Sequence, residues 1–197
     1  MKYSRQSGIS LLEILVTIAI LSILSVMAAP SVQELIQNNR ARSITDEFAS
    51  SLYQARSEAV KRGNRITLCA SDPTQMNCDV DVDNFSGGWI VFTDYNGNQI
   101  LDPVGTLFDT TGDGVDDSPE EILFVSGIPA GNVEIITNNV PVPRNAFTYR
   151  SNGLIQGVPL GISIFVRDTD STEQLSRMRI NMTGRVQQCI GSAVKCP

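Results

Sequence analysis

One apolar stretch near the start of the chain limits its possible folds more than any other feature. Residues 9–29 are twenty-one in number and carry a single charge, Glu13. As a helix rising 1.5 Å per residue, they would span roughly 30 Å, the thickness of a bilayer's hydrocarbon core. A carboxylate near the end of such a helix costs on the order of 2–3 kcal/mol unless it is paired. The stretch therefore predicts a membrane helix whose one charge has a partner.

The residues before this stretch predict a leader peptide that is removed. Residues 1–8 are polar, contain two bases and no acid, and end at Gly8. An ordinary secretory signal has its cleavage site after the apolar stretch, whereas here the glycine precedes it. Cleavage after Gly8 would place a new amine at Ile9, four positions from Glu13, a spacing at which groups on a helix meet. We expect this amine, of the same chain or of a neighbouring one, to neutralise Glu13.

The run GISLLE from Gly8 to Glu13, followed by the apolar stretch and Pro30, resembles the N-terminus of type IV prepilins and type II secretion pseudopilins. In that family a prepilin peptidase of the inner membrane cuts after the glycine and methylates the new N-terminus. The resemblance therefore implies cleavage between Gly8 and Ile9 and N-methylation of Ile9. It also implies that Glu13 registers the subunit in a filament, and we expect Pro30 to contribute to assembly where the apolar stretch ends.

The charged residues predict on which side of the membrane the rest of the chain lies, and they disfavour some functions. Lys2 and Arg5 precede the apolar helix, which predicts that the N-terminus is cytoplasmic and that the residues after the helix lie in the periplasm. The chain has 15 basic and 21 acidic residues, and without these two bases the balance is 13 against 21, or −8. Such a balance disfavours binding of polyanions over the whole surface. The chain has no histidine, so histidine-based catalysis is excluded, and no catalytic arrangement is found. We expect no enzyme.

The four cysteines fit an oxidising compartment, where pairing is the default. Cys69, Cys78, Cys189 and Cys196 allow three connectivities, and the C-x-x-C spacing of zinc sites is absent. We favour the local pairs Cys69–Cys78 and Cys189–Cys196, each of which would contribute about 2–3 kcal/mol by closing a short loop. The crossed pairing, which would tie the chain's end to the first strand region, stays open.

After Pro30 the pattern becomes that of an amphipathic helix. Apolar residues at three- and four-residue steps predict a stripe that packs on a sheet. Gly63 suits the C-terminal cap, so one helix is predicted from Ile9 to Arg62, about 80 Å long at the standard rise. The stripe comprises Leu35, Ile44, Phe48, Leu52, Ala55 and Ala59.

Beyond Gly63 the sequence predicts strands. The signals are alternation, β-branched residues and the turn dipeptides at 96–97, 152–153 and 183–184, of which the last two suggest hairpins. One long helix against antiparallel strands is an α+β architecture. The expected segments are a leader at 1–8, a membrane and filament-core helix at 9–30, its amphipathic continuation at 31–63 and a β-rich head at 64–197. The expected strands are 65–71, 88–94, 121–125, 132–137, 146–149, 162–167, 176–182 and 186–189.

Three sequence segments indicate which branch of the family the chain resembles: SEAVKRGNRITLCASD, GGWIVFTDYNGNQILD and MTGRVQQC. They resemble the GspH/FimT branch of minor pilins and pseudopilins over most of the chain, and residues 102–144 only loosely. The resemblance implies a type IV pilin-like fold and a minor pilin that acts in pilus assembly or initiation. Its implied partners are prepilin peptidase, other pilins and inner-membrane lipid. Members of this branch also serve as type II secretion pseudopilins or as DNA-binding minor pilins in transformation, and these alternatives stay open.

Two groups of charged residues suggest ligand binding, the first of a cation and the second of DNA. From Asp72 to Glu121 the chain holds twelve acids and no base. Within that block, DTTGDGVDDSPE at 109–120 partly fits the calcium loop pattern D-x-[DN]-x-[DN]-G-x5-E, whose oxygen ligands suit Ca²⁺. No flanking helix pair is evident, and acidic hairpin loops explain the block as well. The candidate calcium ligands are Asp109, Asp113, Asp117 and Glu120.

The second group is Gly184-Arg185-Val186-Gln187. DNA-uptake members of the branch carry Gly-Arg-x-Arg here and contact the phosphate backbone, which implies a DNA contact at Arg185. Gln187 stands where the second arginine would be, and phosphate affinity grows with the number of cationic contacts. Three further bases, Arg177, Arg179 and Lys195, lie in the same third of the chain. A hairpin glycine followed by a solvated arginine is the alternative.

Overall fold

The computed structural model describes residues 10–129, 133–137, 145–157, 161–170 and 174–190, except for the side chains of residues 26–31 and 190. Helix α1 (Leu11–Arg62) is the first element, which confirms the predicted long helix, although Ile9 lies outside the described residues. The helix ends as expected. Gly63 adopts a φ of 71°, and its N–H donates to the carbonyl of Ala59 at 3.1 Å, a left-handed helix cap.

The chain divides into two compact units, residues 1–39 and residues 40–197. The first unit contains the N-terminal part of α1, in which every described side chain from Ser10 to Leu24 is exposed. Among the described residues, no helix combines the length and hydropathy needed to cross a membrane. The second unit contains the rest of α1 and all the strands.

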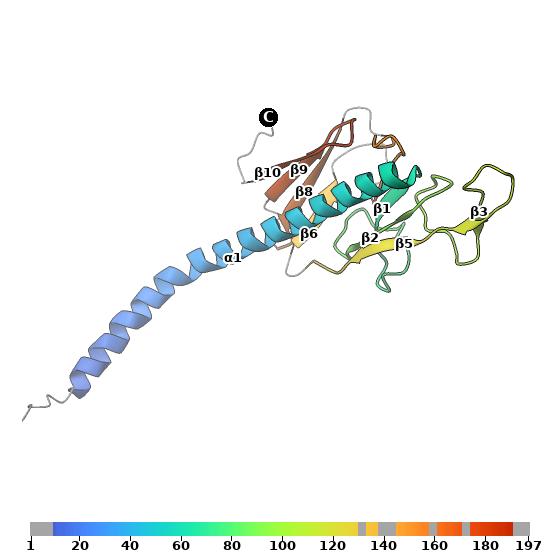
Figure 1. The fold of residues 1–197 in the computed structure, drawn as a ribbon. Helices are drawn as coiled ribbons and strands as arrows, with labels where there is room; N and C mark the ends of the chain where they lie inside the picture. The colour runs from blue at the N-terminus through green and yellow to red at the C-terminus, as the bar shows by residue number, and fades with distance from the viewer. Residues whose placement is uncertain (1–9, 130–132, 138–144, 158–160, 171–173, 191–197) are drawn as a thin grey trace, which may run out of the picture. The chain divides into compact units, whose positions relative to one another are not determined.

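In the described part of the chain, ten strands make up three antiparallel sheets. Figure 1 shows the strands together with helix α1. All eight predicted strands are present, and β3 and β4 are additional. The first sheet has the order β5-β2-β1-β7, the second has the order β10-β9-β8-β6, and β3 and β4 pair as a small third sheet. The strands are β1 (Ile66–Ala70), β2 (Trp89–Thr93), β3 (Leu107–Phe108), β4 (Ser118–Pro119), β5 (Ile122–Ser126), β6 (Val133–Thr137), β7 (Ala146–Tyr149), β8 (Ile162–Asp168), β9 (Gln174–Ile180) and β10 (Val186–Ile190).

The apolar stripe of α1 packs on both large sheets. One buried cluster joins Phe48 and Leu52 of the helix to Trp89 of β2 and Ile164 of β8. The predicted stripe is confirmed from Ile44 onwards, with Ala41 and Ala49 added to it. Leu35 does not belong to it: it lies in the first unit and is 59% exposed. The buried residues of the helix therefore begin at Ala41, within the second unit.

The first sheet is covered on its other face as well. Trp89 and Val91 point into the helix-facing core, whereas Ile90 and Phe92 belong to a second buried cluster, as the alternation of strand side chains requires. That second cluster includes Cys69, which forms a disulfide with Cys78 over a Cα–Cα distance of 5.7 Å. This pair confirms the predicted local connectivity and excludes the crossed one.

The other predicted pair, Cys189–Cys196, includes a residue outside the described part of the chain, so its geometry is not described. Cys189 itself is not a free thiol. The turn at 183–184 joins β9 to β10 as a hairpin, as predicted. The turn at 152–153 leads from β7 back to a single bridge between Tyr149 and Ile155 rather than to a second full strand.

Candidate functional sites

The N-terminal unit places the one charge of the apolar stretch in the first turn of α1. The backbone N–H groups of Glu13 and Ile14 donate to the carbonyl of Ser10, and the Leu12 N–H donates to Ser10 Oγ at 3.2 Å. Ser10 therefore acts as an N-cap. The predicted processing residues Gly8 and Ile9 lie outside the described residues. The helix continues through position 30, where the side chain of Pro30 is not described.

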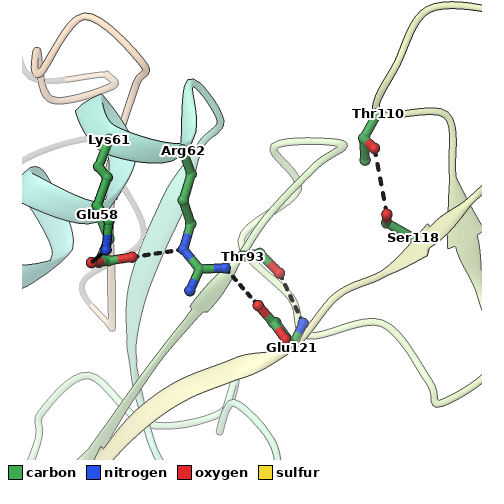
Figure 2. A network of polar contacts seen from close by, with 7 residues as sticks. All are labelled: Glu58, Lys61, Arg62, Thr93, Thr110, Ser118 and Glu121. Atoms are coloured by element: carbon green, nitrogen blue, oxygen red, sulfur yellow. Dashed lines mark hydrogen bonds and ion pairs between the residues drawn. The ribbon is translucent and has the colours of Figure 1, made fainter.

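A chain of ion pairs fixes the opposite end of α1 to the first sheet (Figure 2). Glu58 pairs with Lys61 at 3.3 Å and with Arg62 Nε at 2.6 Å. Arg62 Nη1 reaches Glu121 at 2.6 Å, and the Glu121 N–H donates to Thr93 Oγ1 at 2.8 Å. The hydrogen bond from Arg62, and then that from Lys61, lowers the pKa of Glu58. The pairs of Glu58 with Lys61 and Arg62 can be predicted from the sequence, because i,i+3 and i,i+4 spacings bring side chains together on a helix. The ion pair between Arg62 and Glu121 cannot, because it depends on the fold.

The loop after β2 is built on a buried carboxylate. Asp94 is fully buried and accepts hydrogen bonds from Thr67 Oγ1 at 2.6 Å and from the backbone N–H of Gly97 at 2.6 Å. Gly97 has a φ of 76°, a conformation that favours glycine. Asn96 Nδ2 donates to Asp102 at 2.7 Å and closes the loop. These contacts explain the carboxylate and amide side chains of residues 94–102 as supports of a turn.

The acidic residues of 109–120 do not gather at one point. Asp109 accepts the backbone N–H groups of Gly112 and Gly114 at 2.6 and 2.8 Å, and these bonds, that from Gly112 first, lower its pKa. Asp117 accepts the Thr110 hydroxyl at 2.7 Å, and Figure 2 shows Thr110 facing Ser118 across the arm formed by β3 and β4. In the described part of the chain, no group of three or more acidic or cysteine side chains is placed to hold a metal ion.

The structure thus does not bring Asp109, Asp113, Asp117 and Glu120 together, and calcium binding by them stays a prediction without geometric support. The reason lies in Glu120, which points away from the arm's tip. Its two carboxylate oxygens accept the backbone N–H groups of Tyr95 at 2.9 Å and of Asp102 at 3.0 Å. Glu120 therefore ties the loop after β2 to the base of the arm.

Burial raises the pKa of Glu120 to about 7, and the negative charge of Asp94 adds to this, against the two N–H donors. Because the folded pKa lies above the ordinary value of 4.5, the folded chain keeps this proton over a pH range in which the unfolded chain has lost it. The contribution of Glu120 to stability is therefore present below about pH 4.5 and is lost as the pH rises through about 7.

We expect Glu120→Gln to become more stable relative to the parent chain as the pH rises from about 5 to 8, because the amide does not ionise. The melting temperatures of both chains across this range measure the effect. A difference in melting temperature that stays constant with pH would contradict the prediction. Such a difference is what the loss of a hydrogen-bond acceptor alone would give. Asp116→Asn, at an exposed position of the arm, controls for removal of one acid.

Arg185 lies at the end of the β9–β10 turn with its side chain exposed. Its N–H donates to Asn181 Oδ1 at 2.9 Å. Gly184 beside it has a φ of 73°, and a Cβ at this position would lie 2.7 Å from the carbonyl oxygen of Gly153. The hairpin turn therefore packs closely against the turn that follows β7, so Arg185 is near the segment that begins at Arg150.

Of the other predicted bases, Arg177 and Arg179 lie on β9. Arg177 Nη2 donates to Ser163 Oγ at 2.9 Å, and its guanidinium lies 5.3 Å from the ring centre of Phe165. Arg179 faces Gln187 in the register of β9 and β10, so the residue that replaces the second arginine of the motif lies beside Arg179. Lys195 lies outside the described residues. The expected cluster is therefore spread over the sheet and the turn.

Two family profiles match the chain. The family described as type II transport protein GspH matches residues 45–184, which cover most of the second unit. The prokaryotic N-terminal methylation motif matches residues 3–29. The two matches do not overlap, and they leave residues 30–44 of the helix and strand β10 outside both. No curated protein matches the chain.

Solved structures resemble the fold at low sequence identity. The type IV minor pilin FimU of Pseudomonas aeruginosa has a TM-score of 0.50 at 16% identity, over 77% of this chain and 90% of that one. GspH of Escherichia coli has a TM-score of 0.46 at 13% identity, over 81% and 94%. The minor pseudopilin EpsH of the Vibrio cholerae type 2 secretion system has a TM-score of 0.44 at 12% identity, over 77% and 97%. The likeness to FimU shows a type IV pilin-like fold, and the two lower scores add nothing to it.

Proposed function

The chain belongs to the GspH family of type II transport proteins, and from this premise we propose that it is a minor pilin, a processed structural subunit of a type IV pilus. One observation carries the proposal. A single chain joins an N-terminal methylation motif at residues 3–29 to a GspH head at residues 45–184. The combination describes a subunit that is anchored first and assembled later.

Residues 9–30 are proposed to hold the subunit in the inner membrane and later in the filament core. The described side chains of this segment are exposed, including Leu11 at 77% and Leu21 at 62%. Exposed apolar surface of this extent favours lipid or neighbouring helices. The cytoplasmic N-terminus follows from Lys2 and Arg5, and the Cys69–Cys78 disulfide suits a periplasmic head.

Two other roles remain as further proposals. The family description equally fits a minor pseudopilin of type II secretion, which would share the anchor, the processing and the head. DNA binding through Arg185 is the second. It is supported by the exposure of Arg185 and by its place next to the turn that carries Arg150, and it is opposed by Gln187 and the acidic balance. Prepilin peptidase and other pilins are the proposed partners in each case.

We expect the mature protein to begin at Ile9, to lack residues 1–8 and to carry one N-terminal methyl group. Mass spectrometry of the protein from sheared filaments and from membranes measures this. Gly8→Val should leave the leader attached and keep the protein in the membrane fraction. An unprocessed protein in the filaments, or a mature protein that never leaves the membrane of piliated cells, would contradict the proposal. Recovery only when secretion components are overproduced would indicate a pseudopilin.

A further inference from the structure

A small polar cavity lies beside the C-terminal end of α1, between the loop after β2 and the turn after β7. It has a volume of about 240 Å³. Two arginines from distant parts of the sequence, Arg65 and Arg150, line it together with Tyr95. Hydrogen-bonding side chains complete the wall: Asn64, Ser151 and Asn152.

Both arginines are held by the turns around them. Arg65 Nη1 donates to the carbonyl of Tyr95 at 3.1 Å. A Cβ at Gly97 would lie 3.1 Å from Arg65 Cδ and Nε, so the glycine leaves the space in which the Arg65 side chain lies. The backbone of Arg150 is fixed by two bonds of 2.8 Å, one to the carbonyl of Leu154 and one from the N–H of Gly153.

A third guanidinium adds positive charge behind this turn. A Cβ at Gly153 would lie 3.2 Å from Arg56 Nε, so Arg56 rests directly against the turn that carries Arg150. Gly153 thus leaves space for the Arg56 side chain, as Gly97 does for that of Arg65. The absence of a side chain at each turn allows a guanidinium to pack on the backbone.

The cavity has positive charge without an anion of its own. Within the described residues, neither Arg65 nor Arg150 takes part in an ion pair. The acids near this end of α1 are engaged elsewhere. Glu58 and Glu121 are paired with Arg62, and Asp94 accepts bonds from within its own loop. An arginine with open donors binds carboxylate or phosphate oxygens by charge-assisted hydrogen bonds.

We propose that this cavity binds a carboxylate side chain from an acidic segment of a partner protein. The small volume accommodates one such group, and the half-buried Tyr95 lines the same cavity. A nucleic acid fits less well. It needs several phosphate contacts, whereas the head is net acidic and the helix end beside the cavity carries partial negative charge. Binding here is independent of leader removal and filament assembly.

The test uses the full chain in a neutral detergent and a fluorescent peptide of alternating aspartate and glycine, measured by fluorescence anisotropy. We expect saturable binding that the matched asparagine peptide lacks. The double variant Arg65→Gln with Arg150→Gln should bind at least about tenfold more weakly, since one charge-assisted bond is worth more than one factor of ten. Arg42→Gln is the control: it removes an exposed arginine of α1 that does not line the cavity, and it should bind the peptide as the parent does.

Two results would overturn the proposal. One is equal peptide binding by the parent and the double variant while the fluorescence of the buried Trp89 shows both to be folded. The other is tighter binding of a single-stranded or duplex oligonucleotide of equal charge, lost in the double variant, which would make the cavity a phosphate site. Loss of oligonucleotide binding in Arg185→Gln alone would instead support the DNA role assigned to the hairpin.

Discussion

Phe48→Ala is expected to lower the free energy of unfolding of the head by about 4 kcal/mol, a large part of the 5–15 kcal/mol that stabilises an ordinary domain. Phe48 is fully buried and stands at the centre of an aromatic cluster. Its ring centre lies 5.0 Å from that of Phe85, 4.9 Å from that of Trp89 and 6.3 Å from that of Phe147, each in an edge-on arrangement. Removing the ring leaves a cavity between the helix and the first sheet, and such ring pairs add to the loss from burial alone.

Guanidinium unfolding of residues 40–197 measures this loss, because all buried core residues of the described chain lie within that unit. The chain has one tryptophan, and Trp89 is 1% exposed with its Nε1 donating to Ser51 Oγ at 2.9 Å. Its fluorescence therefore reports directly on the cluster. Phe108→Ala makes the same change on the arm, where the ring contacts Tyr95, and should cost clearly less. Equal losses would show that Phe48 is not central.

Patterns that depend on neighbours in sequence were predictable. The helix stripe from Ile44 to Ala59 was expected because its apolar residues repeat with the period of a helix. The strand from Trp89 to Thr93 was expected because alternate residues fall on opposite faces, although both faces are buried. The Cys69–Cys78 pair was expected because its loop is short. The extent of the stripe was not, since Leu35 continues the period but is exposed. Periodicity identifies a face and cannot show where its partner ends.

In the candidate sites too, local spacing was predictable from the sequence, whereas contacts between distant residues were not. The match of 109–120 to a calcium loop depends on spacing, yet Glu120 turns toward the N–H groups of Tyr95 and Asp102 because the short strands of the arm place it there. The cavity between Arg65 and Arg150 had no sequence signal, because eighty-four positions separate these residues. Antiparallel pairing of β1 with β7 brings them to the same end of the sheet, with Ile66 opposite Tyr149. Only the register of the strands could reveal it.

Glu13→Ala is expected to leave leader removal largely intact and to reduce incorporation into filaments strongly. In the filament core Glu13 would face the N-terminal amine of its own or a neighbouring subunit, which we propose as the partner that makes its burial tolerable. Removing one member of a buried ion pair leaves the other charge uncompensated and costs about 3 kcal/mol, roughly a hundredfold in an equilibrium constant. The fraction of the mature protein in sheared filaments, relative to that in membranes, measures the loss.

Glu34→Ala is the matched control, because it removes an exposed acid of the same helix beyond the apolar stretch, and it should assemble as the parent does. Glu13→Gln separates charge from shape. If pairing with an amine is the reason for the carboxylate, the amide should fail nearly as severely as alanine, since it keeps the size and loses the charge. Normal incorporation of Glu13→Gln would mean that hydrogen bonding suffices. Normal incorporation of Glu13→Ala would mean that the one charge of the stretch has no role in assembly, and the apolar surface around it would then have to set the register alone.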